Sequence, residues 1–216
     1  MVDTAYDFWL FDLDGTLVDV DWTYVRGTFD EVGDRLGHRF SDETAYALWH
    51  GIGDERRRLR ESAGVSVERF WEVFDEVDDP RARAEATYLY DDAALLSDYD
   101  GPLGIVTHCP EPVTGVVLDH LDIRDWFETV VCCSPDVGMK PNPDPVRTAM
   151  GGLGATAADG GALVGDSAVD VGAAWNVDLD AIHIERHGHG RRGHCILCDR
   201  RIESIRELRG LSRPVA

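Results

Sequence analysis

The chain has 216 residues, a length typical of one domain or of one core with a modest insertion. Hydrophobic residues make up 44% of the sequence and charged residues 29%, which excludes collagen-like, low-complexity and wholly disordered chains. The 41 acidic and 21 basic side chains give a formal charge of −20, which argues against binding to nucleic acids or anionic membranes because such a protein repels phosphate groups.

Five short apolar runs divide the chain in the manner of buried parallel strands. They cover residues 5–11, 103–107, 129–133, 162–165 and 181–184. The later runs alternate with helix-like stretches, which predicts an α/β fold: a doubly wound, mostly parallel sheet with helices on both faces. Ligands of such sheets bind outside the carboxyl ends of the strands.

The segment between the first and second runs is long and contains no convincing strand. Apolar residues recur in it at steps of three and four, which is typical of amphipathic helices. The two stripes consist of Trp22, Val25, Phe29, Val32 and Leu36, and of Val67, Phe70, Trp71, Phe74 and Val77. We therefore expect residues 18–95 to form an inserted α-helical cap, and residues 1–17 and 96–184 to form the core.

Residues 185–216 form a C-terminal extension that we expect to lie outside the core sheet. Five of its residues supply a CxxC pair and nearby imidazoles: His187, His189, His194, Cys195 and Cys198. This set predicts a structural Zn²⁺ site, although the second CxxC that usually accompanies the first is missing. A flexible tail and a redox-sensitive thiol pair are the alternatives.

Composition also suggests where the protein works. No apolar run approaches the 18 residues of a bilayer span and the N-terminus lacks a basic region, so we expect a soluble cytoplasmic protein. Of the 21 basic residues, 20 are Arg and only Lys140 is Lys. An acidic, almost Lys-free composition is similar to that of proteins from salt-loving microbes and predicts a halophilic protein, with ordinary acidic drift as the alternative.

The first apolar run ends in two acidic residues, Asp12 and Asp14, followed by Gly15. At the end of a strand this spacing can aim both carboxylates into one crevice. One carboxylate can then act as a nucleophile and the other as a general acid and base, as covalent phosphoryl transfer requires. A surface Asp-Gly turn is the alternative interpretation.

With this DxDGT motif the chain resembles the haloacid dehalogenase (HAD) superfamily, and three further motifs follow in that family's order. Thr107, at the end of a strand-like run, fits the second motif, and Lys140 fits the third. Asp166 and Asp170, in the sequence GDSAVD, fit the fourth. Four concordant motifs over roughly residues 5–184 make coincidence improbable. The resemblance implies a Rossmann-like HAD core with a cap.

The resemblance implies a Mg²⁺-dependent phosphatase that hydrolyses a small soluble phosphomonoester through an aspartyl-phosphate intermediate. Asp12 would be the nucleophile and Asp14 the acid and base. Asp12, Asp166 and the backbone carbonyl of Asp14 would hold Mg²⁺, with Asp170 supporting it from further out or through water. The partner would be a small phosphorylated metabolite.

The same resemblance assigns phosphate binding to Thr107 and Lys140, which would neutralise and orient the phosphoryl oxygens. The presence of Lys140 supports this independently, because a chain that otherwise uses Arg retains one compact ammonium at this position. His108 stands where many relatives carry Asn. It either contacts the phosphate or faces the rim of the site.

Among the branches of the superfamily, the chain resembles the phosphoglycolate phosphatases. Asp14 argues against a haloacid dehalogenase, which generally lacks this second Asp because halide departure needs no protonation. No Lys occurs in residues 1–139, which excludes a Schiff base formed by the cap. A phosphosugar mutase of the β-phosphoglucomutase type and a non-catalytic HAD-fold binding protein are the alternatives.

Overall fold

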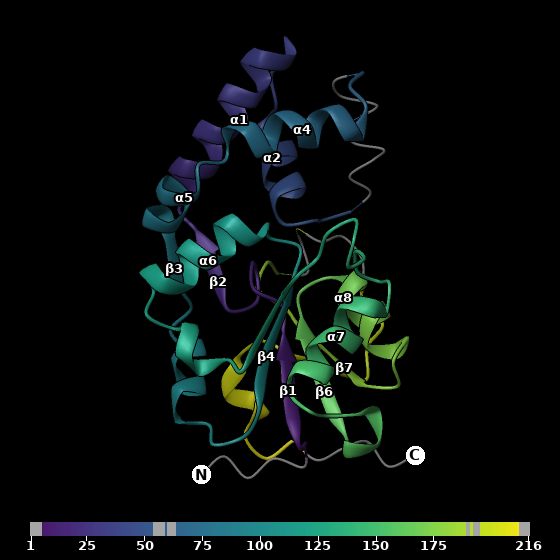
Figure 1. Cartoon of the computed structure of the whole chain (residues 1–216). Helices are drawn as coiled ribbons and strands as arrows, with labels where there is room; N and C mark the ends of the chain where they lie inside the picture. The colour runs from purple at the N-terminus through teal and green to yellow at the C-terminus, as the bar shows by residue number, and fades with distance from the viewer. Residues whose placement is uncertain (1–5, 54–58, 60–63, 189–190, 192–194, 212–216) are drawn as a thin grey trace.

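The computed structural model describes residues 6–53, 59, 64–188, 191 and 195–211, which form a sheet-based core and a group of helices above it (Figure 1). The core sheet contains β1 (Phe8–Phe11), β4 (Leu103–Thr107), β5 (Thr129–Cys132), β6 (Gly161–Gly165), β7 (Asp180–Ile184) and β8 (Arg200–Ile202). All neighbouring strands are parallel, in the order β5-β4-β1-β6-β7-β8. Five of them confirm the five predicted runs.

Helices cover both faces of the core sheet. They are α6 (Glu111–His120), α7 (Asp144–Gly152) and α8 (Ala168–Trp175), with the 3₁₀ helices η1 (Ala93–Asp98), η2 (Arg124–Trp126), η3 (Ala157–Asp159) and η4 (Ile205–Leu208). Side chains of β1 alternate between the faces. Trp9 and Phe11 pack in the cluster that includes residues of α6, η1 and η4, whereas Phe8 and Leu10 pack with α7 and α8. The doubly wound α/β prediction is confirmed.

The strand order places a switch point between β1 and β6. From β1 the chain proceeds to β4 and β5 on one side of the sheet, and from β6 it proceeds to β7 and β8 on the other. The connections that leave β1 and β6 therefore diverge, and a crevice is expected outside the carboxyl ends of these two strands.

Within the described residues, the cap contains the helices α1 (Trp22–Leu36), α2 (Asp42–Trp49), α4 (Val67–Val77) and α5 (Pro80–Ala86). The Asp21 side chain caps α1 by accepting a hydrogen bond from the Thr23 N–H, and Gly37 ends it in the left-handed conformation. Both predicted stripes contribute to one apolar cluster, which includes Val25, Phe29, Val32, Phe70 and Phe74. Tight packing of these side chains gives the cap a hydrophobic core of its own.

Two short strands connect the cap with the core. β2 (Val18–Val20) and β3 (Thr87–Leu89) pair antiparallel where the chain enters and leaves the cap. The expectation that residues 18–95 contain no strand is therefore wrong. Three-residue strands are too short to show a periodic pattern, and the pairing depends on two segments far apart in the sequence.

The C-terminal extension adds to the sheet, contrary to the sequence prediction. β8 pairs in parallel with β7, with Ile184 opposite Ile202. The sequence Arg-Arg-Ile does not read as a buried strand, because two of its three side chains are exposed at the sheet edge.

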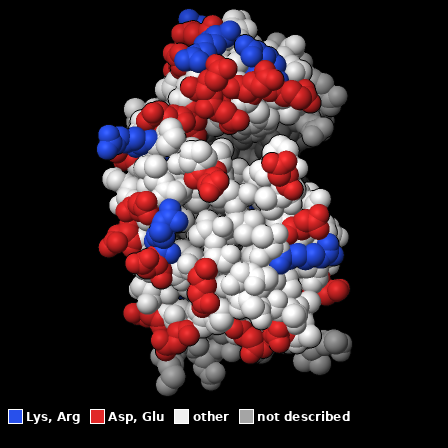
Figure 2. Space-filling model, in the orientation of Figure 1, with Lys and Arg blue, Asp and Glu red and all other residues white. Residues whose placement is uncertain are grey.

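No helix in the described part of the chain is long and apolar enough to span a bilayer. Acidic side chains lie on both the cap and the core in the face shown in Figure 2.

A buried ion pair anchors the start of the extension. Arg186, just after β7, donates two hydrogen bonds to Asp92, of 2.9 and 2.8 Å, and two to the backbone oxygen of Thr16. Asp92 also accepts hydrogen bonds from the Ser204 hydroxyl and the Ile205 N–H. Burial opposes ionisation of Asp92, but these hydrogen bonds outweigh it and lower its pKa below the ordinary 3.8.

Replacing Asp92 by alanine should destabilise the protein by about 3–5 kcal/mol, because it leaves the Arg186 guanidinium buried without its carboxylate. Urea unfolding would measure the change, with the exposed Asp91→Ala as control, expected within about 0.5 kcal/mol of wild type. A depressed pKa stabilises the folded state above the unfolded pKa, so the difference between Asp92→Ala and wild type should shrink as pH falls below about 4. An unchanged unfolding midpoint would contradict the anchoring role.

Candidate functional site

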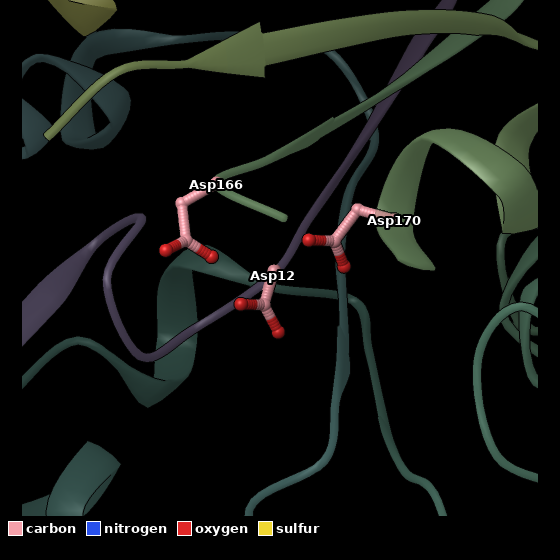
Figure 3. Close-up of side chains that lie close together, drawn as sticks. All are labelled: Asp12, Asp166 and Asp170. Carbon is pink, nitrogen blue, oxygen red and sulfur yellow. The ribbon is translucent and has the colours of Figure 1, made fainter. Parts of the chain in front are cut away.

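Three carboxylates meet at the predicted crevice. Asp12 directly follows β1, Asp166 follows β6, and Asp170 lies in the first turn of α8. Their side chains point toward one another (Figure 3), and one ligand atom from each lies within 4.8 Å of the others. All three residues are buried. The sheet topology thus gathers the acidic residues of two motifs that are more than a hundred residues apart in the sequence.

Lys140 compensates part of this negative charge. Its ammonium donates hydrogen bonds to Asp12 Oδ1 at 2.7 Å, to Asp170 Oδ1 at 2.6 Å and to the Val106 backbone oxygen at 2.8 Å. An ammonium has three donors, and here each has an acceptor. The Lys140 side chain is 2% exposed, so these interactions are made away from bulk water.

The pKa shifts in this cluster reflect burial and mutual charge. Burial raises the pKa of Asp12 well above its ordinary value, and the attraction of Lys140 only partly offsets this. For Asp170, burial also favours the neutral acid, but Lys140 and the hydrogen bonds from Ser167 together outweigh it and lower the pKa. Burial opposes the charge on Lys140, yet Asp12 and Asp170 raise its pKa. Three acidic side chains thus share one ammonium, and a further cation bound beside them would favour the ionised form of Asp12.

Two glycines permit the carboxylates to approach the backbone. A Cβ at Gly165 would lie 2.3 Å from the Asp170 Cγ, so no side chain fits there while Asp170 keeps its place. Gly15 has a φ of +73°, and a Cβ there would lie 2.8 Å from Asp166 Oδ2. The glycines in DxDGT and GDSAVD are therefore part of the geometry of the site.

Asp14 faces the cap rather than the other carboxylates. Its Oδ1 accepts a hydrogen bond of 2.6 Å from Arg83 on α5, and Arg83 also pairs with Asp78 at 3.3 Å. The Arg83 guanidinium lies over the Trp49 ring, 4.2 Å from its centroid. The sequence analysis missed Arg83, because nothing distinguishes it from the other 19 arginines. This contact joins the cap to the first motif.

Thr107 and His108 are the two remaining predicted phosphate ligands. Thr107 is the last residue of β4, and His108 follows it. Thr107 is buried, and its hydroxyl accepts a hydrogen bond from the Cys109 N–H. His108 is exposed, and its Nε2 accepts a 2.9 Å hydrogen bond from the Lys140 N–H. Accepting this bond requires a ring nitrogen without a proton, and the contact ties the second motif to the third. Phosphate binding by Thr107 and His108 stays a prediction.

His187, in the C-terminal extension, lies beside the cluster of aspartates. Its Nε2 lies 3.0 Å from Asp166 Oδ2 and its Nδ1 lies 2.9 Å from the Tyr46 hydroxyl of α2. Within the described residues, only the three aspartates bring three or more candidate ligand atoms together, so His187, Cys195 and Cys198 form no such group. His189 and His194 lie outside the described residues. The structure therefore gives no support to the Zn²⁺ prediction, and it places His187 between Asp166 and Tyr46.

The chemistry of the donor set fits a hard divalent cation. Carboxylate oxygens are the ligands that Mg²⁺ takes in proteins, and the soft sulfur ligands that favour other metals are absent from this group of aspartates. Such a cation would also stabilise the ionised form of Asp12, which burial disfavours. Asp14 lies outside this group of side chains, consistent with the expectation that its backbone carbonyl, not its carboxylate, contributes.

Comparison with known proteins identifies the family. The model of the haloacid dehalogenase-like hydrolases matches residues 9–184, which contain all four motifs. The chain belongs to this family of hydrolases. The motif-one carboxylates, Lys140 and the GDSAVD acids thus occupy one end of a HAD core, and the cap helices lie above it (Figure 1).

Individual HAD relatives match most of the chain. A phosphoglycolate phosphatase of Yersinia pseudotuberculosis is 30% identical over 175 residues, covering 76% of this chain and 74% of the relative. One from Cupriavidus necator is 29% identical over 218 residues, covering 95% and 92%. A solved haloacid dehalogenase-like family hydrolase from Streptococcus pneumoniae superposes with a TM-score of 0.74 at 18% identity, covering 94% and 97%, and shows that the fold is shared.

Proposed function

We propose that the protein is a Mg²⁺-dependent phosphatase that hydrolyses a small soluble phosphomonoester. The observation that carries the proposal is the buried cluster of Asp12, Asp166 and Asp170 around the Lys140 ammonium, at the switch point of a HAD-family sheet. The names of the curated relatives support a phosphatase and suggest 2-phosphoglycolate as a substrate to test first.

Asp12 is the proposed nucleophile. One of its carboxylate oxygens attacks the phosphorus atom, the ester P–O bond breaks, and the phosphoryl group is transferred to Asp12 as an aspartyl-phosphate. Asp14 donates a proton to the leaving oxygen. Bound Mg²⁺, held by Asp12, Asp166 and the Asp14 carbonyl with Asp170 in support, would offset the charge of the phosphate and polarise its oxygens.

The second half of the reaction restores the enzyme. Asp14, now a carboxylate, accepts a proton from a water molecule that attacks the phosphorus of the aspartyl-phosphate. The bond to Asp12 breaks and inorganic phosphate leaves. Throughout both halves, Lys140 and Thr107 would hold the phosphoryl oxygens in place, as preorganised donors stabilise charge that develops in the transition state.

We further propose that residues 18–95 act as one cap over a core of residues 1–17 and 96–184. Closure of the cap would exclude water while the aspartyl-phosphate forms. The Arg83–Asp14 ion pair supports this division, since it joins cap helix α5 to the acid–base residue. The extension of residues 185–216 then completes the sheet through β8.

A phosphate-release assay tests the function. We expect turnover of small phosphomonoesters with Mg²⁺ and its loss with EDTA, and an optimum in multimolar KCl if the charge of −20 reflects a halophilic, cytoplasmic enzyme. Detection of an isomerised sugar phosphate instead of free phosphate would favour the mutase. A panel without any turnover, at low and high salt, would contradict the phosphatase.

A further inference from the structure

The C-terminal extension contributes a side chain that the phosphatase mechanism does not use. His187 follows β7 by three residues, and its side chain is only 1% exposed. A buried imidazole is costly unless its polar atoms are hydrogen-bonded. Here Nε2 faces a core carboxylate and Nδ1 faces a cap hydroxyl, so the ring bridges two parts of the molecule.

The core partner of this ring is Asp166, one of the three clustered aspartates. The distance from His187 Nε2 to Asp166 Oδ2 is 3.0 Å. Gly15 lies close to both atoms: a Cβ built at Gly15 would lie 2.8 Å from the carboxylate oxygen and 3.2 Å from the ring nitrogen. Glycine is therefore required in the first motif for the His187–Asp166 contact as well as for its turn. A hydrogen bond to one oxygen of a carboxylate fixes the direction in which the group presents itself to a metal.

The cap partner is Tyr46, on α2. A carboxylate only accepts hydrogen bonds, so an imidazole that donates from Nε2 to Asp166 uses Nδ1 to accept from the Tyr46 hydroxyl. Burial raises the pKa of Tyr46, which keeps this hydroxyl protonated and able to donate. One tautomer of the ring thus satisfies both contacts in the order Tyr46, His187, Asp166.

Aromatic contacts hold the bridge in place. The rings of His50 and His187 have centroids 4.2 Å apart, and the Tyr46 ring lies 4.4 Å from that of His50. The Arg191 guanidinium lies over the Tyr46 ring, 4.6 Å from its centroid. Side chains of the cap and of the extension thus lie against the rings of His187 and Tyr46.

We propose that His187 is a positioning residue that orients the metal-binding carboxylate Asp166 and couples it to the cap through Tyr46. This inference rests on the proposed function in taking Asp166 as a metal ligand. It assigns the C-terminal extension a part in metal binding. It also makes metal affinity depend on the docking of α2, because the cap supplies one end of the hydrogen-bonded chain.

Binding of Mn²⁺ to the metal-free, full-length protein, followed by electron paramagnetic resonance, tests the proposal without turnover. His187→Ala should weaken Mn²⁺ binding about 10- to 100-fold, the usual effect of removing a residue that orients a metal ligand. His187→Gln, whose amide nitrogen can replace Nε2, should stay within a few-fold of wild type. Tyr46→Phe should weaken binding about two- to tenfold, as expected for one lost hydrogen bond.

Controls separate positioning from folding. The exposed His120→Gln should bind Mn²⁺ as wild type does, and thermal melting in EDTA should show each variant folded. In the phosphatase assay, the Mg²⁺ concentration for half-maximal rate should rise in His187→Ala and Tyr46→Phe by the same factors as the Mn²⁺ dissociation constant. The rate at saturating Mg²⁺ should stay within a few-fold.

Three results would overturn the inference: wild-type affinity in His187→Ala, equal loss in the Ala and Gln variants, or nitrogen coupling to Mn²⁺ that reveals His187 as a direct ligand. If wild-type protein binds Mn²⁺ but hydrolyses no phosphomonoester, the proposed function fails while the role of His187 is still decided by the affinities. If wild-type protein binds no Mn²⁺, both fail.

Discussion

Replacing Asp12 by asparagine should reduce phosphate release by about 10⁴-fold or more, because the amide cannot form the aspartyl-phosphate. The substitution keeps the shape of the side chain, and the asparagine Oδ1 can still accept a hydrogen bond from the Lys140 ammonium, which Asp12 accepts at 2.7 Å. The loss should therefore appear in kcat. Steady-state kinetics on the best substrate of the phosphate panel would measure it.

Stability should not fall with activity in this variant. Burial raises the pKa of Asp12, and Asp170 and Asp166 add repulsion to its charged form, so the neutral amide relieves an unfavourable charge in the metal-free protein. The melting temperature in EDTA should equal or exceed that of wild type. The control is Asp7→Asn, which should retain full activity. Asp7 is exposed and directly precedes β1, at the end of the strand opposite Asp12. Residual turnover within 100-fold of wild type would contradict a nucleophilic Asp12.

Replacing Lys140 by methionine should lower both activity and stability. The substitution removes the ammonium while it keeps an apolar chain of similar length, and it leaves Asp12 and Asp170 buried without their common partner. Breaking such a buried pair costs about 3–5 kcal/mol of folding free energy. Loss of a charge that stabilises the transferring phosphoryl group should lower kcat by about 10²- to 10³-fold.

Arginine should not rescue this position. Three hydrogen bonds of 2.6–2.8 Å converge on one nitrogen of Lys140, a geometry that suits a compact ammonium and not a planar guanidinium. We therefore expect Lys140→Arg to lose activity as the methionine variant does. The exposed Arg147→Met removes only a surface ion pair with Asp144 and should change stability by less than about 1 kcal/mol. Urea unfolding with and without Mg²⁺ would compare them, and a fully active Lys140→Arg would contradict the assignment.

Most of the clustered site could be predicted from local sequence. Asp12 and Asp166 each follow a short apolar run, and parallel strands bring their carboxyl ends to the same edge of the sheet. Lys140 was conspicuous as the single Lys of the chain. These residues now lie in one buried cluster, whereas their catalytic roles stay proposals that the Asp12 and Lys140 variants test.

The shortest strands could not be predicted from the local sequence. β2, β3 and β8 each contain three residues, too few to establish a period, and each forms through pairing with a distant partner. A strand of this length is stabilised by its neighbour and not by its own sequence, since β propensity depends strongly on context. The sequence analysis therefore placed the C-terminal extension outside the sheet, whereas β8 forms an edge strand of it.

The sequence by itself determined the parallel α/β core, the helical cap and the carboxylates at the strand ends, because hydrophobic periodicity and strand-terminal motifs are properties of neighbouring residues. Only the tertiary structure decided which charges meet across the molecule. Arg83 reaches Asp14 over a separation of 69 residues, and His187 meets Tyr46 over 141. Such pairs depend on how the cap and the extension pack on the core, since hydrogen bonds and ion pairs act through space over a few ångströms.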